Sequence, residues 1–490
     1  MQSRIRPRPG SRALLGASDS PQTLSEAWPA LAGLSAVFLF EMLDNSILNV
    51  ALPTIGRDLS ASTISLQWVS GAYSVLFGGL MLAFAALADR VGRRRVMLVG
   101  LVFLGIASLA TLLVQNVWEL IAVRALMGTA AAMTTPGSNA LAFRLFPGDQ
   151  LRVRAMTLIS TVGVVGLAIG PTVGGFVLSF APWQTLLLIN VPIAALAFIG
   201  IRMGVPADDR AGLHRDPIDL AGAFLGTAAI VLALLSPTLF VDADAPAALP
   251  WIAAAAAVAA GAGFVLRERS ARHPLLDLPL IARPLVSSGL ALKAATGLAT
   301  AGLSYLVTLH LQFDLGWTPV EAALGMLPQV VVLLAGGSLV SPLITRLGLT
   351  TAAWLSAIAV VSGLAVYTAL SEFGYVWIAL ALALVAAGMR VVGVAAGTNV
   401  MRGLPADRTT VGAALVDTAS EVTTGVGVAI AGTILALMFS GTITAGDWTA
   451  HQTIEFRNGV TYAGLALTVL SALLVGWGVA RGARPAVAPR

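Results

Sequence analysis

The sequence lacks cysteine altogether and contains one lysine, four histidines and few charged residues. Without cysteine the chain has no disulfide, no reactive thiolate and no iron–sulfur ligand. Lys293 stands between Leu292 and Ala294, whereas a phosphate-binding loop requires Gly-Lys followed by serine or threonine. No metal-binding spacing joins the four histidines, which are His214, His273, His310 and His451. These absences argue against an enzyme, a bound metal or cofactor and the direct use of ATP.

Apolar residues dominate instead: 57% of the 490 residues are hydrophobic and only 11% are charged, unlike a soluble domain. They form runs of about 20 residues, the length of a membrane-spanning helix, without the alternation of a membrane β-barrel. The first run covers 29–50. The later runs cover 67–88, 96–115, 118–143, 153–178, 184–202, 217–239, 248–266, 286–311, 320–343, 350–370, 375–398, 409–438 and 459–480. The sequence therefore predicts an all-α integral membrane protein with fourteen transmembrane helices.

The arginines indicate the orientation of these spans. With the N-terminus inside, 24 of the 29 basic residues fall in inner loops and tails, and only Arg57 and Arg457 fall outside. The other three, Arg124, Lys293 and Arg390, lie within spans. Because one missed span would invert every later loop, this bias supports an even number of spans with both termini in the cytoplasm. We expect a multi-pass protein of the bacterial cytoplasmic (inner) membrane.

A weak internal repeat divides the chain. The segments 87–95 and 343–348 follow the second and tenth spans and share an arginine, an aliphatic residue and a glycine. Parallel repeats of this kind build many secondary transporters, with the site where the halves meet. We therefore expect two six-helix bundles with two helices between them. The expected units are a cytoplasmic basic arm at 1–28, an N-terminal bundle at 29–203, a two-helix insert with cytoplasmic loops at 204–284, a C-terminal bundle at 285–480 and a cytoplasmic tail at 481–490.

The first span carries a polar stripe. Glu41, Asp44, Asn45 and Asn49 fall within an arc of about 140° on a helix, opposite an apolar face. A carboxylate near the bilayer centre costs about 2.5–3.5 kcal/mol, so it normally faces a bundle interior or a wet cavity on an ion or substrate path. The alternative is a helix end at the lipid headgroups. Glu41 lies about 18 Å into the span, which disfavours that alternative.

Charged residues recur in later spans. In the thirteenth, Asp417 and Glu421 are four residues apart and share one face of the helix, a pattern that a plain polar seam between helices would also produce. Arg390 and Glu421 both lie about 18 Å from the cytoplasmic loop between them, which predicts an intramembrane ion pair. Arg124 needs an acidic partner or water and matches Asp44 in depth. Its role is either a proton relay or a static structural pair.

The loop after the second span combines an acid with several arginines. One interpretation is that these residues serve only as a signal for membrane topology, because positive charges mark the cytoplasmic side. Alternatively, Asp89 accepts from a neighbouring helix N-terminus or an arginine and latches the two halves together in one state. The latch candidates are Asp89, Arg90, Gly92, Arg93 and Arg94.

The fifth span has a face without side chains, because Gly166, Gly170 and Gly174 repeat at four-residue spacing. A second helix can approach this face closely. Pro171 removes a backbone donor and is expected to bend the span. Ordinary small-residue packing between helices would use the same pattern.

Four of these segments resemble the sequence motifs of one family. They are Leu43-Asp44 with the run from Asn49 to Pro53, the loop from Ala85 to Arg95, Arg124 with Gly128, and the run from Gly166 to Gly175. In them the chain is similar to the major facilitator superfamily, in its fourteen-helix drug:proton antiporter branch (EmrB/QacA-like). Two positions depart from the pattern: Ala85 replaces a glycine, and Met127 replaces the glutamine usual before Gly128.

The resemblance implies a secondary active transporter that exports lipophilic, mainly cationic, drugs in exchange for protons by alternating access. The residues expected to couple proton and substrate are Glu41, Asp44, Arg124, Asp417 and Glu421. The implied antiporter hinge consists of Gly166, Gly170, Pro171, Gly174 and Gly175. Small lipophilic molecules, protons and the lipid bilayer are the expected partners. No cofactor, ATP or nucleic acid is expected, and a monomer should suffice.

Two other functions are kept in view. Within transporters, the alternative is a proton-coupled exporter of a dedicated lipid, antibiotic or other metabolite. A channel is disfavoured, because a channel is expected to contain repeated pore segments and not buried acids beside an antiporter hinge. Steady conductance uncoupled from a proton gradient would reveal one.

Overall fold

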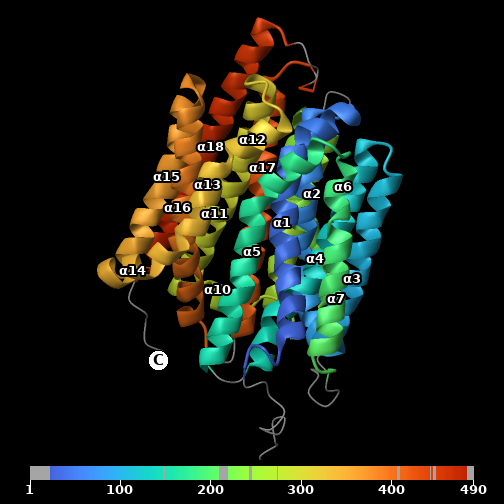
Figure 1. Cartoon of the computed structure of the whole chain (residues 1–490), viewed down its shortest axis with the longest axis vertical. Helices are drawn as coiled ribbons and strands as arrows, with labels where there is room; N and C mark the ends of the chain where they lie inside the picture. The colour runs from blue at the N-terminus through green and yellow to red at the C-terminus, as the bar shows by residue number, and fades with distance from the viewer. Residues whose placement is uncertain are drawn as a thin grey trace, which may run out of the picture.

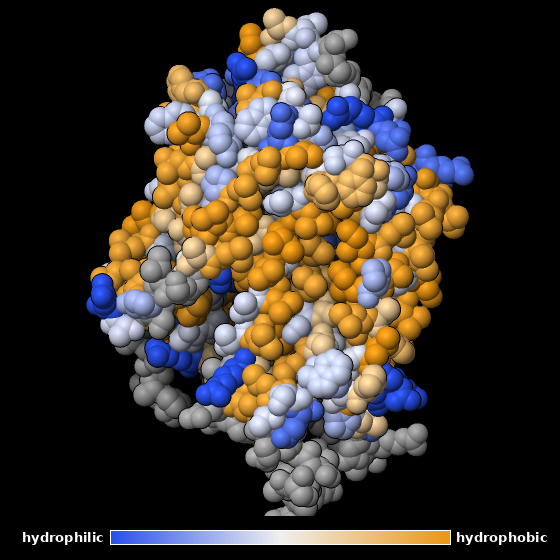
Figure 2. Space-filling model, viewed as in Figure 1, coloured by the Kyte–Doolittle hydropathy of each residue, from blue (hydrophilic) through white to orange (hydrophobic). Residues whose placement is uncertain are grey.

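The structure, a computed structural model, describes residues 23–146, 149–208, 219–241, 246–272, 274–405, 409–441, 443–444 and 448–482. Within these ranges the regular elements are all helices, most of them upright and side by side (Figure 1). A broad band of apolar side chains covers the flank seen in Figure 2, as expected for a surface that faces lipid. Most of the predicted basic arm, His214, His273 and the end of the predicted tail lie outside the described residues.

The N-terminal helices pack around one another as a group. They are α1 (Trp28–Asp58), α2 (Thr63–Val91), α3 (Arg93–Ala110), η1 (Thr111–Leu113), α4 (Val117–Leu145), α5 (Asp149–Leu178), α6 (Gln184–Leu188) and α7 (Asn190–Gly204). Side-chain caps begin two of them: Ser62 accepts from the N–H of Ser65 at α2, and Asn116 accepts from that of Glu119 at α4. Gly92, with φ of 117°, makes the tight turn from α2 to α3.

The C-terminal helices form a second group. They are α10 (Leu278–Ile281), α11 (Pro284–Leu309), the π-helix η3 (His310–Asp314), α12 (Pro319–Gly325), α13 (Leu327–Ala335), α14 (Gly337–Leu347), α15 (Leu349–Leu370), η4 (Ser371–Phe373), α16 (Tyr375–Gly403), α17 (Thr409–Met438) and α18 (Ala450–Gly482). A capping box at Thr318 and Glu321 starts α12.

Thirteen of the described helices are long and apolar enough to cross a membrane. The exception among the predicted spans is 320–343, which the structure divides into the three shorter helices α12, α13 and α14. Pro328 and Pro342 cannot donate within a helix, and Gly336 is followed directly by Gly337, where helix propensity is lowest. The total of fourteen spans, and the placement of both termini in the cytoplasm, stay predictions.

The two groups meet along two seams. One seam joins α2 to α17, and the other joins α5 to α12 and α13. The helices α8 (Leu220–Val241) and α9 (Leu249–Ser270) form a hairpin whose first arm packs on both α2 and α17. The Oγ1 of Thr227 on α8 donates to the carbonyl oxygen of Gly79 on α2 at 2.8 Å. The hairpin therefore covers the first seam and leaves the second uncovered.

Contacts between the groups are dense at the end where α1 finishes, uppermost in Figure 1. Nε2 of Gln312 donates to the carbonyl oxygen of Val50 at 2.8 Å. Val50 also packs with Ala323 and Met326 in one buried cluster. We call this the outer contact, since the predicted orientation places it outside the cell.

Candidate functional site

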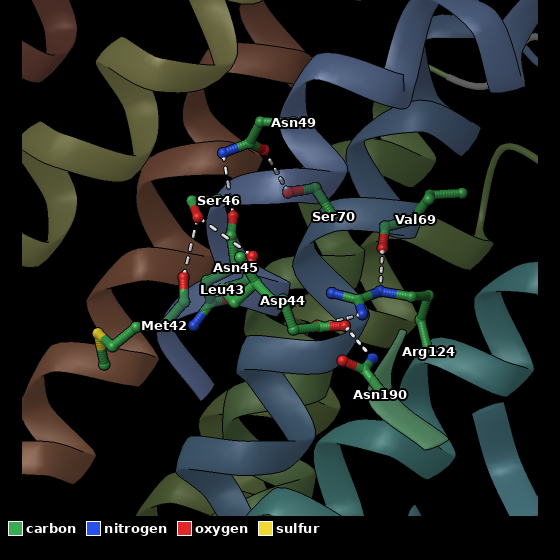
Figure 3. A network of polar contacts seen from close by, with 10 residues as sticks. All are labelled: Met42, Leu43, Asp44, Asn45, Ser46, Asn49, Val69, Ser70, Arg124 and Asn190. Atoms are coloured by element: carbon green, nitrogen blue, oxygen red, sulfur yellow. Dashed lines mark hydrogen bonds and ion pairs between the residues drawn. The ribbon is translucent and has the colours of Figure 1, made fainter. Parts of the chain in front are cut away.

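A buried ion pair ties together four of the N-terminal helices (Figure 3). Oδ2 of Asp44 on α1 lies 2.5 Å from Nη1 of Arg124 on α4, and both residues are at most 1% exposed. Nδ2 of Asn190 on α7 donates to the other carboxylate oxygen of Asp44 at 2.7 Å. Nε of Arg124 donates to the carbonyl oxygen of Val69 on α2 at 3.2 Å. The charges of Asp44 and Arg124 thus compensate each other inside this group.

Sequence reasoning matched Asp44 with Arg124 by depth but assigned no role to Asn190. The available signal was a lone amide within an apolar run, because such a group is buried only when it has hydrogen-bond partners. The guanidinium of Arg124 also lies 4.6 Å from the ring centroid of Tyr73, a cation–π contact. Each carboxylate oxygen of Asp44 therefore accepts one hydrogen bond in this conformation.

The polar stripe of α1 continues along the helix above the pair (Figure 3). Nδ2 of Asn49 donates to the carbonyl oxygen of Asn45 at 3.2 Å, and its Oδ1 accepts from Ser70 on α2 at 3.4 Å. Ser46 bonds within α1 and reaches the carbonyl oxygen of Gly166 on α5 at 3.4 Å. The stripe therefore faces the bundle interior and not the headgroups.

A second cluster of charges gathers side chains from both groups. Glu41 on α1 is 4% exposed, and its Oε2 accepts from Thr135 on α4 at 2.9 Å. Asp417 and Glu421 on α17 lie within electrostatic range of Glu41, and Lys293 on α11 lies within range of all three carboxyl groups. With three acids and one base, the fully ionised cluster has a negative net charge. We call these four residues the acidic cluster.

Glu421 is the member with unused hydrogen-bonding capacity. Ser74 and Asn45 are its polar neighbours from the N-terminal group. Although Glu421 is only 6% exposed, its Oε2 has no hydrogen-bond partner among the described residues. A buried acceptor without a partner is costly, so this oxygen is ready to take a proton or a cation.

Lys293 was recorded by sequence reasoning only as a basic residue within a span. The signal was present, because it is the chain's one lysine and it lies inside an apolar run. Its partners could not be read from the sequence, since they belong to helices distant along the chain.

The predicted ion pair of Arg390 with Glu421 does not form. Nε of Arg390 donates to the carbonyl oxygen of Leu333 on α13 at 2.9 Å, and Nη2 bonds to the same oxygen. The last carbonyls of α13 lack intrahelical partners because the helix ends at Ala335, and Arg390 satisfies one of them. Glu421 faces α2 instead, where its Cβ approaches Gly78. Arg390 and Glu421 lie at similar depth in the membrane, but their side chains contact different helices.

The predicted latch does not join the two groups in this conformation. Oδ1 of Asp89, near the end of α2, lies 2.7 Å from Nε of Arg93, the first residue of α3. The acid at the N-terminus of α3 is Asp208, whose carboxylate accepts from the backbone N–H groups of Arg94 and Arg95 at 3.2 and 3.0 Å. Arg94 donates to the carbonyl oxygen of Arg202 at 2.6 Å. Among the described residues, the loop binds within its own group.

The glycine face of α5 packs on α1. A side chain at Gly166, Gly170 or Gly174 would collide with Leu39, Ser46 or Ile47 respectively. Gly175 points elsewhere and touches α12 of the other group, where a Cβ would meet Pro319 and Ala323. The predicted close approach of another helix to this glycine face is therefore present, and that helix is α1. On its other side α5 contacts α12 and so forms the edge of the N-terminal group at the second seam.

A cavity of about 530 Å³ opens at the second seam. Side chains of α5 from Arg152 to Val165 line it on one side, and Leu334 and Arg390 line it on the other. It lies toward the predicted cytoplasmic end, opposite the outer contact. The groups thus close against each other at one end and part at the other.

Two helical groups that meet over buried charges and open at one end define a membrane transport protein. Solved structures share this fold. A bacterial homologue of the human lysosomal transporter Spinster, in an inward-facing and unoccupied conformation, matches with a TM-score of 0.64 at 16% identity, covering 93% of this chain and 97% of that chain. A peptide transporter POT in complex with sulfate matches with a TM-score of 0.65 at 15% identity, covering 92% of this chain and 95% of that chain.

The chain belongs to the Major Facilitator Superfamily, which it matches over residues 34–428. Methyl viologen resistance protein SmvA of Salmonella typhimurium is 30% identical over 85% of this chain and 84% of its own length. Multidrug efflux pump LfrA of Mycolicibacterium smegmatis is 31% identical, over 67% and 64% respectively. Putative multidrug resistance protein MdtD of Escherichia coli is 28% identical, over 88% and 90%. With its many apolar helices, the chain is a multi-pass protein of the inner membrane.

Proposed function

We propose that this protein is a multidrug efflux transporter that exchanges lipophilic, mainly cationic, compounds for protons by alternating access. The observation that carries the proposal is the acidic cluster, which brings acids from both groups of helices together inside the protein. Resistance and efflux relatives such as SmvA and LfrA support the class of substrate. A single chain contains every residue used in the proposal, in keeping with a monomer.

The acidic cluster suits an exchange of proton for cation. Glu421 has an acceptor oxygen without a partner, and the field of Glu41 and Asp417 adds to its negative potential. A lipophilic cation is attracted by this negative potential and also makes apolar contacts, whereas an anion is repelled. Protonation of one carboxyl group weakens the attraction, and protonation of two brings the net charge of the cluster to zero and releases the cation. Proton and drug thus compete for the same charges.

The Asp44–Arg124 pair has a different role in the proposal. Both oxygens of Asp44 already accept hydrogen bonds and Arg124 compensates its charge, so the pair attracts a cationic substrate less than Glu421 does. It holds α1 at a fixed rotation in the N-terminal group, which aims Glu41 at the cluster.

The proton gradient supplies enough free energy for this exchange. Each proton that enters releases roughly 2.3 kcal/mol per 100 mV of membrane potential and about 1.4 kcal/mol per pH unit. When one proton is exchanged for one monovalent cation, no net charge crosses the membrane, so the pH difference alone drives the exchange and supports about a tenfold drug gradient per pH unit. The membrane potential contributes only when more protons enter than positive charges leave.

Uptake of methyl viologen, a dication, into everted membrane vesicles tests the proposal. We expect an imposed pH gradient, acidic inside the vesicle, to drive uptake by the wild type. Glu421→Gln should lower the rate at least about tenfold, because it removes a buried charge that binds the cation. The matched control is Glu372→Gln, which neutralises an exposed acid. Wild-type transport by Glu41→Gln, Asp417→Gln and Glu421→Gln alike would refute the role of the cluster.

Export of one dedicated antibiotic or metabolite is the second candidate function. The observation in its favour is that some relatives are named for a single compound, such as the lincomycin resistance protein of Streptomyces lincolnensis and the cephamycin export protein CmcT of Amycolatopsis lactamdurans. A resistance profile separates the two functions. Protection against several unrelated cations supports multidrug efflux, and protection against a single compound supports the dedicated exporter.

A further inference from the structure

The acidic cluster contains one positive charge, which belongs to the chain's one lysine. Lys293 lies on α11, and α11 packs along α17. The two helices touch at Gly297, where a Cβ would meet the carbonyl oxygen of Ser420. Lys293 lies one turn before Gly297, and Asp417 lies three residues before Ser420. Because both helices run outward in the predicted orientation, the lysine is level with the carboxyl groups of α17.

No close contact fixes the ammonium group of Lys293. Among the described residues it takes part in no ion pair, whereas the guanidinium of Arg124 is bonded to Asp44. Its charge nevertheless acts on all three carboxyl groups of the acidic cluster. Lys293 is half-buried, and a lysine carries a compact charge on a flexible four-carbon stem. It can therefore serve as a resident counter-ion that moves aside when another cation enters.

The formal charges of the cluster decide which partners it accepts. Three ionised carboxylates and one ammonium group give a net charge of −2. Asp44 and Arg124 add nothing, because their charges compensate each other. An uncompensated charge inside a protein is costly, so the interior favours partners that bring the cluster to zero. Two protons do this, and so does one dication, whereas a monocation leaves one negative charge.

We propose that the acidic cluster exchanges one dication, such as a bis-quaternary ammonium compound, for two protons, and that Lys293 sets this number. The inference rests on the proposed exchange of cations for protons and adds its substrate class and stoichiometry. Two positive charges leave the cell and two enter, so the exchange of a dication moves no net charge. When a monocation leaves in the same cycle, one net positive charge enters. Without Lys293 the cluster takes up a third proton in each cycle, which makes the lysine a specificity-determining residue.

The dependence of uptake on membrane potential tests the proposal in everted vesicles that contain the full chain. The probes are methyl viologen, a dication, and ethidium, a monocation, with the pH gradient held constant. Valinomycin and a potassium gradient impose a potential of about 100 mV, positive inside the vesicle. We expect this potential to raise the steady-state accumulation of ethidium by the wild type at least about tenfold, because one net positive charge leaves the lumen in each cycle. The accumulation of methyl viologen by the wild type should not change.

Lys293→Met removes the charge of the side chain and keeps its length. Its accumulation of methyl viologen should rise at least about tenfold with the potential, because three protons now leave the lumen for each dication. It should also bind methyl viologen at least about tenfold more tightly in detergent, since one repulsive charge is gone. The conservative variant Lys293→Arg keeps the charge, so its methyl viologen accumulation should again be independent of the potential. If Lys293→Met does not fold, Lys293→Gln takes its place.

Arg390→Gln is the matched control, because it removes a positive charge within a span but outside the cluster. Its methyl viologen accumulation should stay independent of the potential. A merely structural role of Lys293 would change rates and stability but not this response.

The outcomes separate this inference from the proposed function. A wild type that takes up neither cation when the pH gradient is imposed would refute the proposed function and, with it, this inference. If the wild type takes up both cations, two results would overturn this inference alone. One is a methyl viologen accumulation that follows the potential in the wild type, and the other is one that ignores it in Lys293→Met.

Discussion

At the scale of single residues, charge inside this protein is handled in two ways. Asp44 and Arg124 neutralise each other and are closed to other partners, whereas Glu421 keeps an acceptor oxygen free in a cluster with excess acid. Burial alone does not distinguish the two, because both carboxyl groups are almost inaccessible. The difference lies in the individual oxygens, because each oxygen of Asp44 accepts a hydrogen bond, whereas Oε2 of Glu421 has no partner among the described residues.

Removal of one partner from the Asp44–Arg124 pair should be far more harmful than removal of both. We expect Arg124→Gln to destabilise the protein by about 3–5 kcal/mol, because Asp44 is left as an uncompensated buried charge. The double variant Asp44→Asn/Arg124→Gln should recover most of that loss. Unfolding in detergent, followed by circular dichroism, measures both.

The exposed pair Asp89–Arg93 provides the matched control for that comparison. Its side chains are 37% and 28% exposed, so Asp89→Asn should cost less than about 1 kcal/mol. Equal losses from Arg124→Gln and from the double variant would show that the pair does not act as a compensated unit.

At the scale of the helices, packing depends on where side chains are missing. A methyl group at Gly170 would overlap Ser46, and we expect Gly170→Ala to cost about 1–3 kcal/mol through overpacking of α5 against α1. It should also slow transport. Thermal unfolding together with the everted vesicle assay checks both effects.

Gly393→Ala is the control for this substitution. Gly393 lies inside α16 with open space around it, so alanine should be neutral or stabilise the helix by about 0.5–1 kcal/mol. A harmless Gly170→Ala variant would mean that α5 can move away from α1 without loss.

The hairpin of α8 and α9 is fastened at its base by Asp219 and Arg267, whose side chains make two hydrogen bonds of 2.9 and 3.1 Å. Burial favours the neutral form of the Asp219 carboxyl, but the hydrogen bonds from Arg267 and Gly222 outweigh it and hold the pKa below its usual value. A lowered folded pKa means that the stabilisation is complete above the unfolded value of about 3.9 and is lost as the pH falls through the folded value.

The destabilisation caused by Asp219→Asn should therefore be the same at pH 8 and pH 5 and should shrink only below about pH 4. Thermal unfolding of the variant and the wild type at each pH measures it. A destabilisation that varies between pH 5 and pH 8 would contradict this assignment. If it is constant, any pH dependence of transport in that range arises elsewhere in the protein.

The sequence was sufficient to predict where most of these helices lie in the chain and how deep their charged residues are in the membrane. Long apolar runs and the polar stripe of α1 are local patterns, and the structure reproduces them. The break at Gly336 has a local signal in the sequence, the pair Gly336-Gly337 between two prolines. The direction of Arg390 was not predictable, because it depends on how α13 ends against α16. The depth of a residue along a helix can be predicted from the sequence. The distant helix that its side chain contacts cannot.

At the scale of the whole molecule, the outer contact is expected to open during transport. Val50 and Ala323 pack together across the two groups, and the chain has no cysteine of its own. The pair Val50→Cys/Ala323→Cys should form an oxidative cross-link that stops transport, with recovery after reduction. Mobility shift on a denaturing gel and the vesicle assay record the two effects.

The pair Thr161→Cys/Leu334→Cys, across the cavity on the other side of the membrane, is the comparison. It should react little in the conformation described here and more when the groups rock toward each other. Full transport by the cross-linked Val50 and Ala323 variant would show that the outer contact does not need to part.

The hairpin of α8 and α9 makes the two flanks of the protein unequal. Because Thr227 is bonded to α2 while the same helix touches α17, the hairpin covers that flank in this conformation. The second seam, between α5 and the helices α12 and α13, is not covered by this hairpin. A hydrophobic compound dissolved in the surrounding leaflet would therefore enter laterally from that flank and not from the flank that α8 and α9 cover.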